Sequence, residues 1–299
     1  MIRGDEAGVF LRVVPHGPSG ALRKLVNTGT LVATGTGGPA LMIESGANLG
    51  DPTGGEPAIT STGPGASIGR IENSGTIYHG FRIENQDVVV TATGSPGVFR
   101  NGLLDVPDGN LTFGAGEITL RAFVEVGGGA GTFSTEGTLR LVGRTPVAAD
   151  FKQLTGSTVL MELLGTAPGD YGSLDITGSA NFSGGLALDT TMLSGGLADG
   201  QFYELFRFGS STGGFGSLAV DGTSLPSLAP GLWSYGSLLL SEIWTATRMS
   251  LEVIRSSEKP VPEIDPAGMG SVLALVFGAF GLAERRFRRG RRAGDHAAG

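Results

Sequence analysis

Apolar and polar residues alternate in short stretches along most of the chain, and glycines separate one stretch from the next. Successive side chains of a β-strand point to opposite faces, so a period of two predicts strands with one face buried and the other in water. The clearest examples are Ile118 and Leu120 around Thr119, Val124 and Val126 around Glu125, Leu139 and Leu141 around Arg140, and Leu174 and Ile176 around Asp175. Before the C-terminal segment no helical pattern extends beyond about ten residues. The pattern therefore predicts an all-β body.

A five-residue pattern recurs where such stretches begin. Asparagine, a hydroxyl residue, glycine, threonine and an aliphatic residue occupy 27–31 and again 73–77, with a weaker copy at 135–139. Asparagine tolerates the left-handed backbone and bonds its own chain, and glycine supplies a positive φ, so the pattern is typical of a tight turn before a strand. The first two copies lie 46 positions apart, which predicts two coils of about 23 residues each.

These features favour a right-handed parallel β-helix, a solenoid in which each coil stacks on its neighbour and buries an aliphatic stripe. An antiparallel β-sandwich is the alternative, because it explains the alternation equally well. It does not explain the recurring turn, and we therefore prefer the solenoid.

Composition agrees with many short strands and tight turns. The 299 residues include 53 glycines and no cysteine, and only 16% are charged. The absence of cysteine excludes disulfides, thiolate metal sites and cysteine nucleophiles. The net charge is −7, and without the residues after Glu284 the balance is 15 basic against 27 acidic, or −12. An acidic body repels phosphate backbones, so we expect no nucleic-acid partner.

The C-terminal segment contains three consecutive sequence features. Prolines stand at its start, an uncharged apolar run follows from Ala267 to Ala283, and a cluster of arginines ends it. A helix over the run is roughly 25 Å long, close to the thickness of a bilayer core. Arginines beyond such a run stay on the cytoplasmic side and stop export. We expect a transmembrane helix over 267–284, the alternative being a buried helix with a solvated basic tail. The arginines of the membrane stop signal are Arg285, Arg286, Arg288, Arg289, Arg291 and Arg292.

This order of parts resembles the PEP-CTERM sorting signal of exported proteins in Gram-negative bacteria. The sorting motif is Val261, Pro262, Glu263, Ile264, Asp265 and Pro266. Pro262 and Glu263 match the family's Pro-Glu-Pro core, whereas Ile264 stands where the second proline is usual. The resemblance covers about the last 40 residues. It implies export, a transient stay in the inner membrane, and processing by an exosortase.

The stretch from Gln153 onward is similar to the closing region that precedes this signal in many such proteins, and to the last passenger coils of autotransporters. We expect a β-rich cap, with a final hairpin from Leu232-Trp233 to Leu251-Val253 and an unplaced insert over 234–248. An open solenoid end exposes strand edges and a slice of core. We expect four aromatic residues to cover that slice: Phe202, Phe206, Phe208 and Trp233.

The first dozen residues lack the apolar core of a signal peptide, although an exported protein needs one. We expect the true start, with its signal, to lie upstream. The expected organisation is a glycine-rich β-solenoid over 1–152, a closing region over 153–255, a linker with the sorting motif over 256–266, the membrane helix over 267–284 and a basic cytoplasmic tail over 285–299.

Few residues suggest chemistry. The histidines at 16, 79 and 296 have no metal-ligand spacing, so we expect no metal and no cofactor. Asp170 and Asp199 remain candidates for single calcium sites. Asp105, Asp108 and Glu117 are the candidate acids of a β-helix polysaccharide lyase or hydrolase, but Asp108 is predicted to lie in a turn.

We therefore expect a non-enzymatic surface or matrix protein. By resemblance, its setting is a biofilm or exopolysaccharide matrix, with exosortase as processing partner and glycans or other matrix proteins as further partners. The alternatives are an autotransporter passenger fragment and the lyase-type enzyme.

Overall fold

The computed structural model describes residues 11–13, 25–27, 41–43, 48–49, 56–61, 68 and 70–256. Within these ranges the chain forms strands and turns, and a 3₁₀ turn, η1 (Gly127–Gly129), is the one helical element. The all-β prediction is confirmed. Nothing in the described ranges is a helix of the length and apolarity needed to cross a membrane. The predicted sorting motif, membrane helix and arginine cluster lie outside the described residues.

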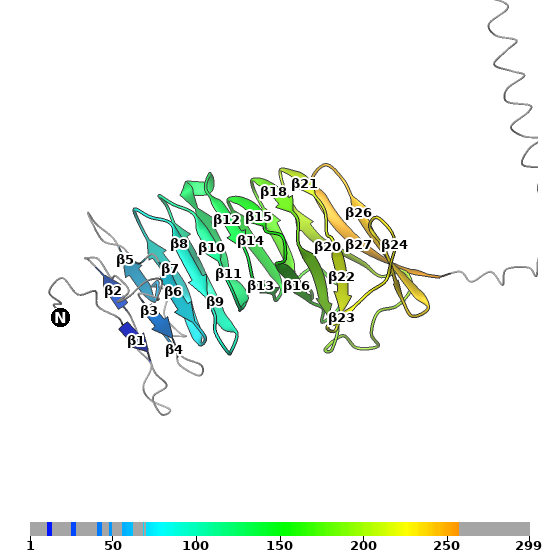
Figure 1. Ribbon diagram of the computed structural model, residues 1–299, viewed down its shortest axis with the longest axis horizontal. Coiled ribbons are helices and arrows are strands. Elements are labelled where there is room, and N and C mark those ends of the chain that lie inside the picture. The colour runs from blue at the N-terminus through cyan, green and yellow to red at the C-terminus, as the bar shows by residue number, and fades with distance from the viewer. Residues whose placement is uncertain are drawn as a thin grey trace, which may run out of the picture. The chain divides into compact units, whose positions relative to one another are not determined.

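One sheet, called face A here, contains nine strands that all pair in parallel (Figure 1). Its strands in order are β1 (Leu11–Val13), β3 (Leu41–Ile43), β6 (Arg70–Asn73), β8 (Val88–Thr91), β10 (Leu111–Phe113), β12 (Thr132–Thr135), β15 (Asp150–Gln153), β18 (Ser179–Phe182) and β21 (Ser210–Gly213). Neighbours in this sheet are separated in sequence by strands that belong elsewhere, so the chain returns to face A once per turn.

Two further parallel ladders, faces B and C, share three long strands: β7 (Thr76–Ile83), β9 (Gly97–Val106) and β11 (Glu117–Val126). The first half of each belongs to face B and the second half to face C. Face B also contains β4 (Asn48–Leu49), β13 (Thr138–Leu141), β16 (Thr158–Glu162), β19 (Gly185–Asp189) and β22 (Ser217–Val220). Face C also contains β2 (Leu25–Asn27), β5 (Ile59–Ser61), β14 (Arg144–Ala148), β17 (Ser173–Ile176) and β20 (Phe202–Arg207).

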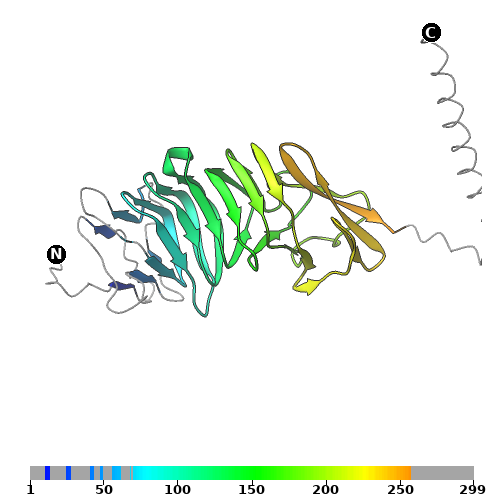
Figure 2. The ribbon, with the colours of Figure 1, turned by 45° about the horizontal axis from the view of Figure 1, so that its top comes forward.

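Each turn therefore adds one strand to each of three faces, and successive turns stack along one axis (Figure 2). Parallel pairing throughout the body excludes the antiparallel sandwich. The predicted alternation is confirmed in β13 and β17, where every second residue is buried. It also holds in the second half of β11, while Thr119 in the first half is buried with its neighbours.

The central turns have the predicted length. The backbone N–H of Asn110 donates to Asp87, 23 residues earlier, and that of Thr132 donates to Asn110, 22 residues earlier. Later turns lengthen, since Ser179 bonds Asp150 29 residues before it.

The recurring pattern does not occupy equivalent positions in its first two copies. Asn27 lies in β2 on face C opposite Ser61, whereas Asn73 lies in β6 on face A opposite Ile43. The 46-residue spacing is therefore not two equal coils. The second and third copies are equivalent, because both connect a face A strand to a face B strand.

At this corner the glycine is needed for space. Asn73 does bond its own chain, accepting from the N–H of Gly75 at 3.1 Å. Neither Gly75 nor Gly137 has a positive φ, contrary to the expectation. A Cβ on Gly137 would lie 2.3 Å from the carbonyl oxygen of Gly116 in the turn below. Stacked turns approach so closely here that no side chain fits.

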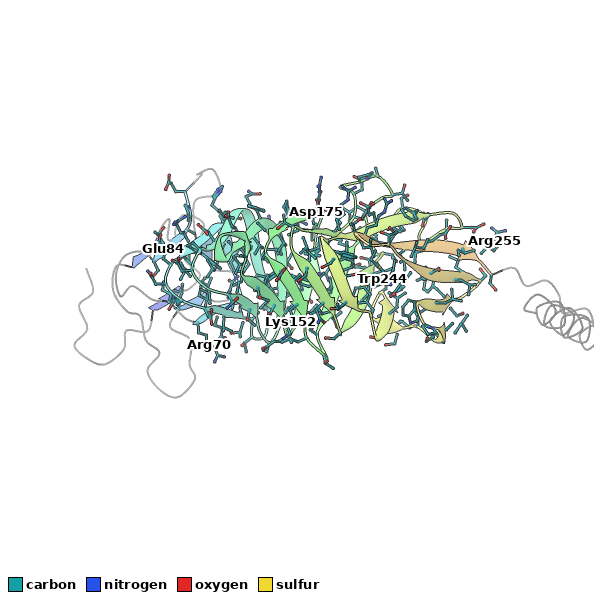
Figure 3. The ribbon with its side chains drawn as sticks, turned by 90° about the horizontal axis from the view of Figure 1, so that it is seen from above. Arg70, Glu84, Lys152, Asp175, Trp244 and Arg255 are labelled. Atoms are coloured by element: carbon teal, nitrogen blue, oxygen red, sulfur yellow. The ribbon has the colours of Figure 1, made fainter. Side chains whose placement is uncertain are left out.

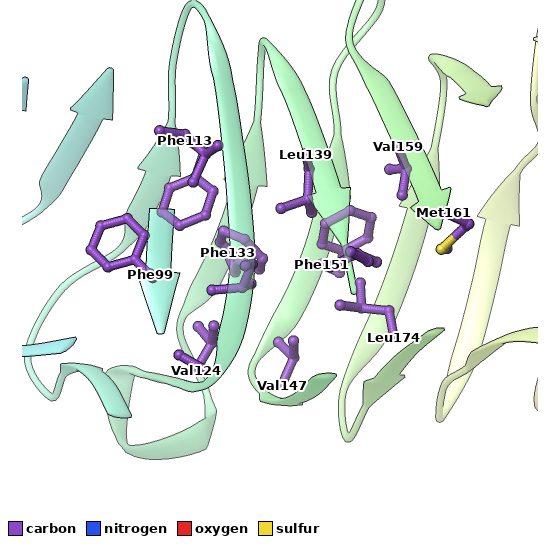
Figure 4. Packing of buried hydrophobic residues seen from close by; sticks show 14 of the residues in the cluster. Phe99, Phe113, Val124, Phe133, Leu139, Val147, Phe151, Val159, Met161 and Leu174 are labelled. Atoms are coloured by element: carbon purple, nitrogen blue, oxygen red, sulfur yellow. The ribbon is translucent and has the colours of Figure 1, made fainter. Parts of the chain in front are cut away.

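A column of phenylalanine rings runs through the core (Figure 4). Successive centroids are 5.0 to 5.9 Å apart, and most pairs are edge-on or tilted, which aromatic rings favour. The rings in order are Phe81, Phe99, Phe113, Phe133, Phe151 and Phe182. Each ring therefore packs against the next ring along the column, and these contacts connect successive turns.

Antiparallel strands close the far end. β27 (Arg248–Arg255) covers the open side of β20, and β23 (Thr223–Ser224) covers that of β22. The remaining strands there are β24 (Ser227–Ala229), β25 (Leu232–Tyr235) and β26 (Leu238–Trp244). Parallel pairing continues through Gln153 as far as Val220, and the antiparallel strands begin after it.

The closing end places the insert and corrects one expectation. The insert over 234–248 contains β26, the central strand of an antiparallel sheet with β25 and β27. Phe206, Phe208 and Trp233 are buried as predicted, but Phe202 is 48% exposed. Trp244 stands in its place against the end of the ring column, 5.4 Å from Phe182.

Candidate binding site

A hollow of about 600 Å³ opens on the outside of face C, where the last parallel strands meet the first antiparallel one. β17, β20 and β27 form it, and Asp175 lies on the outer surface there (Figure 3). Its lining comprises Asp175, Ile176, Thr177, Glu204, Arg207, Phe208, Gly209, Thr247 and Arg248. Charged groups from three strands that are distant in sequence therefore share one surface.

The local backbone explains why these groups face outward. Asp175 lies between two buried residues of β17 and therefore points to solvent. In β20 the register against β27 shifts between Glu204 and Phe206, and both Leu205 and Phe206 are buried. This β-bulge turns both Glu204 and Arg207 to the outside.

Ion pairs connect the hollow's charges. Asp175 pairs with Arg144, and its other oxygen lies 3.9 Å from Nε of Arg207. Glu204 pairs with Arg207 and accepts from Arg248 at 3.2 Å. The three guanidiniums are 55 to 61% exposed, and the two carboxylates only 17 to 20%. The carboxylates thus hold the guanidiniums toward solvent.

The electrostatics favour binding over proton transfer. Partial burial opposes ionisation of Glu204, but hydrogen bonds from Arg207 and Arg248 prevail and lower its pKa. The same contact with Glu204 raises the pKa of Arg207. A carboxylate with a lowered pKa is a poor proton donor at neutral pH. With Arg144 counted, three cations face two anions, so the rim suits an anionic or hydroxyl-rich ligand.

The acids predicted from sequence do not converge on this hollow. Asp105 in β9 is buried and lies 2.6 Å from Arg82. Its burial, with further carboxylates nearby, raises its pKa despite that contact. Asp108 lies in the turn after β9, as predicted, and accepts from the N–H of Asn85. Glu117 in β11 pairs with Arg140 at 2.8 Å.

The candidate calcium residues are also apart. Asp199 accepts from the N–H of Arg255, and the backbone carbonyl of Asp170 accepts from Leu164. Across the described ranges no group of three or more His, Asp or Glu side chains could hold a metal ion.

In the sequence Asp175 stands out only as the polar residue between two aliphatic ones. No sequence pattern singled out the other charged residues of this site, Arg144, Glu204, Arg207 and Arg248. Alternation in β17 predicts that Asp175 faces outward. The same reasoning fails for Glu204 and Arg207, because the bulge in β20 interrupts the alternation. Their proximity depends on the antiparallel return of β27, which no local pattern encodes. No family model, curated protein or solved structure matches this chain.

Proposed function

We propose that this chain is an exported structural or adhesive protein of the cell surface or extracellular matrix, built as a right-handed parallel β-helix and processed by an exosortase. The observation that carries the proposal is the architecture of the body: one strand per turn on each of three parallel faces. Such a stack presents long, regular outer surfaces, which suits repeated contact with extended partners.

The closing strands support a body that remains a separate unit. Open ends of stacked strands invite pairing with other molecules, and natural proteins cover them. β27 and β23 cover two of the three faces at the C-terminal end. The described residues up to Arg255 belong to one compact unit, and the predicted linker and sorting motif follow in the sequence.

The test is the fate of the C-terminal segment. We expect the full gene, expressed in a host with an exosortase, to yield exported protein that has lost the residues after the sorting motif. Intact-mass spectrometry of the surface or medium fraction measures this. Secreted protein that still ends at Gly299 would refute the sorting proposal.

A matched variant isolates the motif. Pro262→Ala with Glu263→Ala changes the motif and leaves the apolar run and arginines untouched. We expect this variant to accumulate uncleaved in the membrane fraction. Deletion of the exosortase should give the same accumulation of the unaltered chain.

The hollow on face C favours a second candidate function, a polysaccharide lyase or hydrolase, because two carboxylates and two arginines from neighbouring strands line it and Arg144 pairs with one of the carboxylates. Incubation with uronate polymers, followed by size analysis of the products, tests it. Depolymerisation that Glu204→Gln abolishes would favour the enzyme. Unchanged polymer length in both samples would favour a binding role.

A further inference from the structure

Two arginines and a tyrosine stand in register on the outside of face B. Tyr78 of β7 pairs with Arg100 of β9, and Arg100 pairs with Arg121 of β11. Both arginines are exposed and Tyr78 is half-buried. We call these three residues the arginine ladder. Strands in a sheet are about 4.8 Å apart, so the ladder places two cations on consecutive rungs.

The ladder arginines lack the carboxylate partners that five other arginines of the body have. Neither Arg100 nor Arg121 makes an ion pair or side-chain hydrogen bond with another residue in the described ranges. Two acids of β11 lie four residues from Arg121. Glu117 is engaged by Arg140, and Glu125 makes no ion pair with Arg121. Arginines paired with carboxylates are Arg82, Arg140, Arg144, Arg207 and Arg248.

This arrangement has an electrostatic cost. Like charges directly opposite each other on neighbouring strands destabilise a sheet. An anion between the two guanidiniums would remove the repulsion and satisfy their donors. Elsewhere on the same face Arg140 is surrounded by three carboxylates, so the sequence can neutralise a cation in this sheet.

The backbone beside the ladder is fixed. Directly after Tyr78 and Arg100 the chain turns the corner to face C, with Gly80 and Gly102 both at positive φ. A Cβ on Gly80 would lie 2.2 Å from the carbonyl oxygen of Leu103, so consecutive corners pack backbone on backbone. The spacing of the rungs therefore cannot slip.

We propose that the arginine ladder binds carboxylate groups of an acidic polysaccharide rich in uronic acids. The planar guanidinium matches a carboxylate in a two-pronged hydrogen-bonded pair. Two rungs can take carboxylates from one extended chain, and the ring of Tyr78 offers a flat apolar surface to a sugar.

The choice of a glycan rests on the proposed surface location. The test is binding of the purified full chain, in mild detergent, to polygalacturonate, galacturonate monomer and neutral dextran, measured by calorimetry. We expect polygalacturonate to bind in a salt-sensitive manner, the monomer to bind at least tenfold more weakly, and dextran not to bind.

Variants locate the site. Arg100→Ala with Arg121→Ala should weaken polygalacturonate binding at least tenfold without lowering the thermal midpoint, because it also removes the repulsion. Arg100→Lys with Arg121→Lys keeps the charge and should retain part of the affinity. Arg255→Ala, which removes an exposed arginine on β27, is the control for the loss of a surface cation elsewhere and should bind within twofold of the unaltered chain.

The proposal would be overturned by full binding of the double alanine variant, by an equal loss in Arg255→Ala, or by tighter binding of a single-stranded oligonucleotide through the same arginines. Loss of binding in Arg207→Ala with Arg248→Ala alone would place the glycan in the hollow and also overturn it. Tail processing does not enter this assay, so failure of the export proposal and failure of the ladder are seen separately.

Discussion

Phe133 contacts the ring of the turn before it and the ring of the turn after it, 5.0 Å from Phe113 and 5.7 Å from Phe151. It is fully buried, as are its neighbours in the column. Each ring therefore contributes both apolar burial and an aromatic contact between its turn and the next. A gap in the column would weaken the packing between the turns on either side of it.

Phe133→Ala should lower the free energy of unfolding by about 3 to 5 kcal/mol, because it leaves a cavity that close-packed neighbours cannot fill. The urea midpoint measures the loss. Phe202→Ala, which removes a ring that is 48% exposed, is the control and should cost under about 1 kcal/mol. Equal losses in the two variants would contradict a structural role for the column.

Glu242 is a carboxylate in an unfavourable place. It lies in β26 under the turn at Gly231, whose carbonyl accepts its N–H. One carboxylate oxygen accepts from Nε1 of Trp244 at 2.8 Å, and the other is buried without a partner among the described residues. Burial raises the pKa of Glu242 to about 7, although the Trp244 hydrogen bond opposes the shift.

The raised pKa gives a sign to the pH dependence. Below about pH 4.5 Glu242 is protonated in both the folded and the unfolded chain, and the fold then carries no cost from a buried negative charge. As the pH rises toward 7 the unfolded chain ionises first, so stability is lost. Glu242→Gln should be more stable than the unaltered chain at pH 8, by on the order of 2 kcal/mol, and equal to it at pH 4. Thermal midpoints against pH measure this. Glu252→Gln on β27 is the control, and a pH-independent gain in Glu242→Gln would contradict the argument.

At the scale of elements, single cations link neighbouring strands of a face. Arg140 in β13 bonds Glu117 of β11 at 2.8 Å and Asp189 of β19 at 2.7 Å, and lies 3.7 Å from Glu162 of β16. Burial alone would raise the pKa of Asp189, but hydrogen bonds from Thr191 and Arg140 lower it. One side chain thus holds three acids from three turns together.

Arg140→Ala should leave those three carboxylates facing one another and cost about 1 to 2 kcal/mol at pH 7. Because the pKa of Asp189 is lowered in the folded chain, its ionised carboxylate stabilises the fold at any pH above its pKa in the unfolded chain, which is near 4. This stabilisation is lost as the pH falls through the pKa of Asp189 in the folded chain. The difference between variant and unaltered chain should therefore shrink toward pH 3. Lys152→Ala, an exposed cation on face A, is the control, and an Arg140→Ala deficit that grows on acidification would contradict the network.

The elements themselves could largely be predicted from sequence, because alternation in β13 and β17 is a local property. Turn length near 23 residues was also predictable, though for an imperfect reason, since Asn27 and Asn73 lie on different faces. The closing sheet could be predicted only as a β-rich cap with a final hairpin. The place of β26 between β25 and β27 could not, because tertiary contacts set those registers. The hollow was missed for the same reason, because Glu204 and Arg248 meet only through that antiparallel pairing.

At the scale of the whole molecule, the closing strands separate the core from other copies. Trp244 lies 6.0 Å from Phe215 and 6.2 Å from Phe208, at the end of the ring column. β27 occupies the edge of β20 that would otherwise accept another strand. Removing this region uncovers rings and an edge together.

A chain ending at Val220 should associate end to end in a concentration-dependent manner, because exposed strand edges and apolar ends pair with one another. Light scattering coupled to size-exclusion chromatography measures the mass, and circular dichroism checks that the strands persist. A chain ending at 256 keeps β27 and should be less associated at the same concentration. Equal masses for the two chains would contradict the capping role.

The ring column requires each turn to contribute one phenylalanine that contacts the ring of the turn before it and the ring of the turn after it. Turns of 22 and of 29 residues both meet that demand, since the extra residues lie in loops between strands. After duplication or deletion of one entire turn between Phe113 and Phe151, each ring inside the column would still have a neighbouring ring on both sides. The body can therefore grow or shorten in units of one turn, and its outer faces can diversify while the interior keeps a single rule.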